Sequence, residues 1–277
     1  MLSLLAMPFF SRALIALCAA GVSFPVLGTF ILHLELIPAR FAVMHGALLG
    51  AAAALLLGLN PAGTAMAASV IAGIGVAVIS WRGKVSAGGS LGLIMTLCMG
   101  LAFIIFYKSN VHAVEAFNIL WGNILTLTDS DARLILLTGG GILLFLIAAY
   151  KEIHLVLYDR VLAQASGVPA KLIYGGIMLA VCAGIAAAMQ VTGALMLDAV
   201  TLLPALAARR LGKSFRGLIL WGSLLGAAMN LAGFALAFAL DLPVGPAIIL
   251  TGSIGIGAVH GIGRIAAGRE QSIEHRA

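Results

Sequence analysis

Charged residues are scarce in this chain. They make up 9% of its 277 residues, while 62% are hydrophobic and the mean hydropathy is +1.14. A soluble domain carries about a quarter charged residues, so this composition excludes soluble enzymes and nucleic-acid-binding modules. It predicts an all-α, polytopic membrane protein, because runs of roughly 20 apolar residues cross a bilayer as helices.

Cysteine is also rare. The chain has three cysteines, Cys18, Cys98 and Cys182, each inside an apolar run and without paired spacing. Neither a disulfide framework nor a zinc knuckle is predicted. These cysteines are interpreted as small packing residues.

Catalytic and nucleotide-binding motifs are missing. The tripeptide at 212–214 resembles the end of a phosphate-binding loop, but Ala207 stands where that loop needs a glycine. No serine, histidine and aspartate occur at nucleophile-elbow spacing, and no histidine pair has metalloprotease spacing. We therefore expect no enzyme activity and no permanently bound cofactor, and any energy for transport must come from a partner or an ion gradient.

The apolar runs predict one membrane domain over residues 1–277 with about nine spans. The expected spans are residues 13–34, 41–59, 62–81, 87–107, 134–150, 172–189, 193–208, 218–240 and 244–263. A weaker apolar piece at 114–127 is interrupted by Asn118, Gly122 and Asn123. We interpret that piece as interfacial or re-entrant.

Basic residues predict the orientation, because Lys and Arg in short loops stay on the cytoplasmic side. With nine spans, the loops of one side hold these residues: Arg40, Arg82, Lys84, Lys151, Arg160, Lys171, Arg209, Arg210, Lys213, Arg216, Arg264, Arg269 and Arg276. The opposite loops from Asn60 onward contribute only Lys108. The amino terminus is predicted outside and the carboxyl terminus in the cytoplasm.

Glycine recurs at spacings that allow close helix packing. The pairs are Gly46/Gly50, Gly88/Gly92, Gly222/Gly226 and Gly257/Gly261. In lipid, such small residues let helix backbones approach closely, so we expect these positions to lie at helix contacts.

Three segments, in matching order and spacing, resemble the permeases of bacterial ABC importers for zinc, manganese and iron ions. Residues 117–125 with Ser130-Asp131 resemble that family's Leu-Phe-Gly-Asn-Ile-Leu segment. Residues 158–169 resemble its Phe-Asp-Pro-Glu-x-Ala…Gly-x-Pro loop, and residues 191–208 resemble its Val-Gly-x-Leu-Leu…Leu-Pro-Ala-x-x-Ala helix. The resemblance covers most of the chain from about Pro38 onward.

The segment at 158–169 has the pattern of a short capped helix. The resemblance implies that it is the coupling helix, which docks in a groove of the ATPase subunit. The coupling residues are then Tyr158, Asp159, Arg160, Leu162, Ala163 and Gly167.

Two ionisable residues inside expected spans are candidate stations for a metal ion. His45 falls on a histidine of the family's second-span motif, although Phe41, Met44 and Leu49 replace that motif's aspartate, serine and proline. Asp198 is a carboxylate about one and a half turns into the seventh expected span. Imidazole and carboxylate both bind zinc or manganese, and we expect His45 to lie nearer the cytoplasm than Asp198.

A weaker pair of candidate metal ligands lies in an outer loop. His112 and Glu115 are three residues apart and share a face if that loop is helical. A solvated surface pair is the plainer interpretation.

The resemblance implies the permease of an ATP-driven importer, a homodimer in the bacterial inner membrane. Its expected partners are two ATPase subunits that bind ATP, an extracytoplasmic metal-binding protein and membrane lipid, with no nucleic acid. Zinc is the first expected cargo and manganese the second. The alternatives are an iron-chelate or cobalamin permease of similar topology, an ion-gradient-driven secondary transporter, for which no inverted repeat is seen, and a structural membrane subunit.

Overall fold

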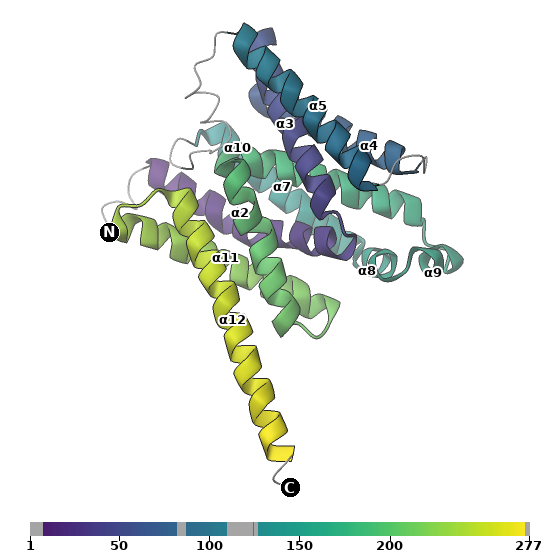
Figure 1. The fold of residues 1–277 in the computed structure, drawn as a ribbon, viewed down its shortest axis with the longest axis vertical. Helices are drawn as coiled ribbons and strands as arrows, with labels where there is room; N and C mark the ends of the chain where they lie inside the picture. The colour runs from purple at the N-terminus through teal and green to yellow at the C-terminus, as the bar shows by residue number, and fades with distance from the viewer. Residues whose placement is uncertain (1–7, 82–86, 110–123, 125–126, 275–277) are drawn as a thin grey trace.

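The computed structural model describes residues 8–81, 87–109, 124 and 127–274 (Figure 1). Every regular element of appreciable length in those ranges is an α-helix, as the composition predicted. The helices are α2 (Pro8–His33), α3 (Ile37–Leu57), α4 (Pro61–Trp81), α5 (Ala87–Lys108), α7 (Asp129–Ala148), α8 (Tyr150–Tyr158), α9 (Arg160–Ala165), α10 (Ala170–Leu211), α11 (Phe215–Leu240) and α12 (Val244–Glu274).

Within the described ranges, seven helices are long and apolar enough to span a membrane, where nine spans were expected. Two expected spans account for the difference. α4 is a helix of 21 residues, and Gly63–Val76 is the apolar part of it among the residues whose side chains are described. The expected span at 193–208 lies in the second half of α10. Its 16 residues rise about 24 Å at 1.5 Å per residue, less than the roughly 30 Å of a hydrocarbon core.

A kink at Gly193 divides α10, which runs for 42 residues. The backbone there has φ 72° and ψ 172°. Side chains with a Cβ are almost never found in this conformation, so glycine is required. The kink redirects the second half of α10, which carries Asp198.

Local capping explains why two spans begin earlier than expected. Thr128 and Asp131 form a capping box, each side chain accepting a hydrogen bond from the other residue's backbone, so α7 starts at Asp129. The Ser214 hydroxyl accepts a hydrogen bond of 3.1 Å from the Gly217 amide, so α11 starts at Phe215. Both caps satisfy amides that an unprotected helix end would leave without partners.

The helices form two packed groups. In one, α3, α4 and α5 enclose a cluster that includes Ala52 and Phe106. In the other, α2, α7, α10, α11 and α12 surround a larger core that includes Phe24 and Leu197. Figure 1 shows the first group above the second, and α10 joins them because its Met189 belongs to the first cluster.

Small residues allow some of the closest helix contacts, as expected. A Cβ at Gly50 would overlap the backbone of α4, and one at Gly226 would overlap the backbone of α2. The same expectation is wrong for Gly92 and Gly257, because no described atom lies within 4 Å of either position. Periodicity identifies a small-residue face but does not reveal whether a helix covers it.

Candidate functional site

Arg40 and Asp198 form an ion pair between the two packed groups. Arg40 lies in the first turn of α3, and Asp198 lies five residues beyond the kink in α10. The Arg40 side chain is only 3% exposed, whereas 43% of the Asp198 side chain is exposed. The pair therefore has one buried partner and one partner that other ligands can reach.

This pairing corrects the placement of Arg40 and adds a partner for Asp198. Arg40 was assigned to a cytoplasmic loop, but it is buried in a helix, and Asp198, expected as a candidate station for a metal ion, has a protein cation as its partner. The physical reason is that a charge removed from water is costly unless an opposite charge meets it. The long Arg40 side chain, at the start of α3, extends into the protein and pairs with Asp198.

The Arg40 guanidinium has one further contact. Its central carbon lies 4.6 Å from the centre of the Phe41 ring, a cation–π geometry. Arg40 Nε has no hydrogen-bond partner among the described residues. Part of its hydrogen-bonding capacity is therefore unused in this conformation.

His45 lies on α3 but apart from the ion pair. Five residues separate it from Arg40, which corresponds to about 7.5 Å along the axis and about 140° around it. His45 Nδ1 lies 2.7 Å from the Phe41 carbonyl oxygen; if Nδ1 donates to it, Nε2 carries the lone pair that a metal would use.

Asp198 pairs with Arg40 in the first turn of α3, whereas His45 lies five residues further along that helix. The order of the two candidate residues along a path stays a prediction. The described residues contain no group of three or more His, Cys, Asp and Glu side chains placed to hold a metal ion. The arrangement suits passing contact with an ion rather than stable binding.

Two other predictions cannot be placed. His112 and Glu115 lie outside the described residues, as does the segment 114–127 apart from residues 124 and 127. Both stay predictions.

The predicted capped helix is present as α9. The Asp159 carboxylate accepts hydrogen bonds from the amides of Val161, at 2.7 Å, and Leu162, at 3.0 Å. Tyr158 is not part of this helix, because it ends α8, and Gly167 has a positive φ of 80° after the helix. The segment is thus two short helices joined at Asp159.

The surface formed by α9 and the adjoining Tyr158 combines apolar and basic character. Tyr158, Val161 and Leu162 are exposed, whereas Ala163 is buried against the rest of the protein. The Arg160 guanidinium lies 4.1 Å from the centre of the Tyr174 ring. A rigid element with exposed apolar side chains is typical of a protein-docking surface.

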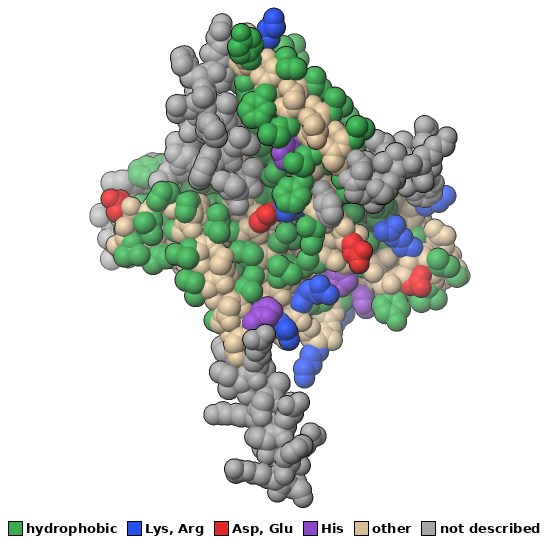
Figure 2. All heavy atoms as spheres, in the orientation of Figure 1, with side chains coloured by type: hydrophobic (Ala, Val, Ile, Leu, Met, Phe, Trp, Pro, Cys, Tyr) green, Lys and Arg blue, Asp and Glu red, His purple; other side chains and the backbone are tan. Residues whose placement is uncertain are grey.

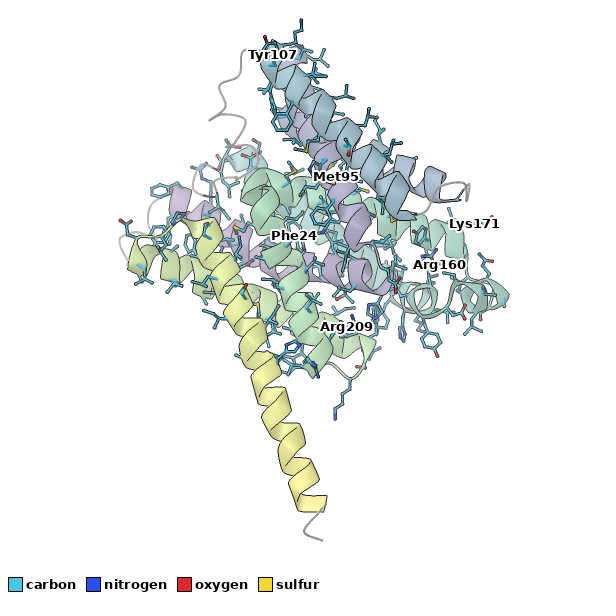
Figure 3. All side chains as sticks on the ribbon, in the orientation of Figure 1. Phe24, Met95, Tyr107, Arg160, Lys171 and Arg209 are labelled. Atoms are coloured by element: carbon cyan, nitrogen blue, oxygen red, sulfur yellow. The ribbon has the colours of Figure 1, made fainter. Side chains whose placement is uncertain are left out.

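Segments predicted to be cytoplasmic lie together at one side of the molecule. The His154 ring of α8 stacks on Phe215 of α11 at 4.9 Å, and His33 at the end of α2 approaches the same ring edge-on at 6.3 Å. Figure 3 shows Arg160 and Lys171 at the right and Arg209 below the centre, and Figure 2 shows most of the blue surface of this face in the same two regions. On segments predicted outside, Arg12 pairs with Asp129 at 3.1 Å.

Known proteins share both sequence and fold with this chain. The ABC 3 transport family matches residues 6–258. The manganese import system permease protein ScaB of Streptococcus parasanguinis is 28% identical over 248 residues, which cover 89% of this chain and 88% of ScaB. The manganese transport system membrane protein MntC of Halalkalibacterium halodurans is 26% identical over 250 residues, which cover 90% of this chain and 86% of MntC.

A solved structure has the same fold. PsaBC from Streptococcus pneumoniae, in complex with Fab, contains a chain that matches with a TM-score of 0.83 at 24% identity. The match covers 93% of this chain and 92% of that chain. The expected all-α permease architecture is confirmed.

Proposed function

Because the chain belongs to the ABC 3 transport family, we propose that it is the permease through which an ATP-driven importer carries a divalent metal ion. It is a multi-pass protein of the plasma membrane and not an enzyme, since ATP hydrolysis belongs to a separate subunit. The observation that carries the proposal is the Arg40–Asp198 pair, which provides a partly exposed carboxylate between two helix groups. The orientation of the termini remains the one predicted from basic residues.

Manganese is the proposed cargo, ahead of zinc. The sequence favoured zinc, but relatives named as manganese permeases are the most prominent. The chemistry agrees with them, because Mn²⁺ prefers oxygen ligands such as Asp198, whereas zinc favours imidazole and thiolate. His45 is a second station that either ion accepts.

Arg40 gives the proposed path a means of control. In the structure it forms an ion pair with Asp198, so this carboxylate has a counter-ion within the protein. A divalent ion carries twice the charge of the guanidinium and competes for the exposed carboxylate oxygen. Displacing Arg40 would loosen α3 from α10 near the kink, which links the arrival of cargo to helix movement.

The segment 158–169 is the proposed contact with the ATPase. Its support is the Asp159 cap, which fixes α9, together with the exposed apolar side chains around that cap. The proposed assembly has two copies of this chain, an ATPase dimer and an extracytoplasmic metal-binding protein. Closure of the ATPase dimer would then push on α8 and α10 through α9.

Uptake measurements test the proposed function. Cells that lack this chain should lose most accumulation of radioactive manganese at limiting concentration, and the wild-type chain should restore it. Zinc and a ferric chelate are measured in parallel. Loss of zinc uptake alone would reverse the metal preference, loss of ferric-chelate uptake alone would favour the alternative permease, and no change in any of the three would contradict metal import.

A further inference from the structure

A cleft of about 650 Å³ opens where α7, α8 and α11 meet. Its lining includes Ile147, Tyr150, Lys151, Arg216 and Leu220. The candidate spans Asp129–Ala148 and Phe215–Leu240 both have an end here. The cleft therefore lies at a boundary between the hydrocarbon layer and water.

The side of the cleft at the ends of the spans is predominantly cationic. Lys151 and Arg216 are both exposed, and the Arg216 guanidinium lies 5.3 Å from the centre of the Tyr150 ring. Glu152 is half-buried and is the single acidic residue in the lining. Two cations against one carboxylate leave a site that favours a phosphate, which Arg and Lys bind by charge-assisted hydrogen bonds.

The side of the cleft toward the spans is apolar and uncovered. Ile147 and Leu220 are 74% and 69% exposed, and the exposed Leu144 and Leu224 continue these faces deeper into the spans. Within a bilayer such faces contact acyl chains. A soluble ligand or protein could reach the cations but not this apolar wall.

We propose that the cleft binds an anionic phospholipid, with its phosphate between Lys151 and Arg216 and an acyl chain along Ile147 and Leu220. The cationic part of the lining matches the phosphate of such a lipid, and the apolar part matches its acyl chain. Juxtamembrane cations attract anionic lipids of the cytoplasmic leaflet, the side on which Lys151 and Arg216 are predicted. This inference does not depend on the metal or on transport.

Trp221, an exposed residue next to Leu220, gives a local probe. The full-length chain, with Trp81 and Trp121 changed to Phe, is reconstituted into phosphatidylcholine vesicles that contain a small fraction of brominated lipid. Brominated phosphatidylglycerol should quench Trp221 more strongly than brominated phosphatidylcholine at the same mole fraction. The anionic lipid should be locally enriched by about fivefold for each cation, the effect expected of a basic side chain near a membrane surface.

The charge variants decide the proposal. Lys151→Gln with Arg216→Gln should abolish the preference for phosphatidylglycerol, while Arg209→Gln with Arg210→Gln removes the same charge elsewhere and should preserve it. Mass spectrometry of co-purified lipid provides a second measurement on correctly inserted protein. An equal loss in both double variants, a preserved preference in the first, or competition by millimolar inorganic phosphate would each overturn the proposal.

Discussion

Asp198 of α10 forms an ion pair with Arg40 of α3, and the two residues differ sharply in exposure. The buried guanidinium has the carboxylate as its counter-charge, whereas the partly exposed carboxylate can also be reached by water or an ion. Removing the carboxylate and removing the guanidinium should therefore change the stability of the protein by different amounts. Comparing stability with transport in such variants separates a structural role of the pair from a role in transport.

Asp198→Asn should destabilise the protein more than Arg40→Gln. The first change leaves a buried charge without its partner, which costs about 3–5 kcal/mol, whereas the second leaves a carboxylate that water can solvate. Thermal unfolding in detergent measures the difference.

The double variant Arg40→Gln with Asp198→Asn should regain most of the lost stability but still import manganese at least about tenfold more slowly. Wild-type uptake by this variant at limiting metal would show that the pair is only structural.

His45→Ala, which leaves the ion pair intact, should also impair uptake while ATPase assembly persists.

Gly193→Ala should be strongly destabilising, by about 1–3 kcal/mol, because alanine does not adopt φ 72° with ψ 172° without strain. Gly257→Ala is the matched control. It lies inside a helix with no described atom near its Cβ position, so the change should be neutral or slightly stabilising. Similar unfolding temperatures for the two variants would contradict the kink.

Replacing residues 158–167 by a Gly/Ser loop should abolish uptake without affecting membrane insertion, because the proposed ATPase contact is lost. A sharper version is Val161→Asp, which puts a charge on the exposed apolar face of α9, and Gln164→Asp is its control on the same helix. Only Val161→Asp should reduce co-purification of the ATPase. If the Gly/Ser variant still co-purified with the ATPase and took up manganese normally, residues 158–167 would not couple the ATPase to transport.

Reporter fusions test the orientation and the number of spans. Fusions after Lys84, Arg160 and Lys213 should report the cytoplasm, and fusions at Asn60, His112 and Gln190 the outside, because the Lys/Arg bias is one-sided. The pair Gln190 and Lys213 is the most informative. If both report the same side, the second half of α10 does not cross the membrane.

The local features of this protein follow from its sequence. Apolar runs must become helices in lipid, because every backbone amide and carbonyl needs a partner within its own segment. The α9 helix was predictable for a similar reason, since the Asp159 cap acts within three residues of chain. Contact at Gly50 could also be expected, although its partner helix could not be named.

The arrangement around the proposed path was decided only by the tertiary structure. The residues around Arg40 in the chain give no indication that α10 lies beside it, so Arg40 was placed in a loop. For the same reason the sequence did not reveal that Asp198 has Arg40 as its partner. The positive φ of Gly193 likewise reflects how α10 packs against two helix groups rather than its local composition. Hydropathy and capping act over a few neighbouring residues, whereas an ion pair between helices depends on where those helices cross.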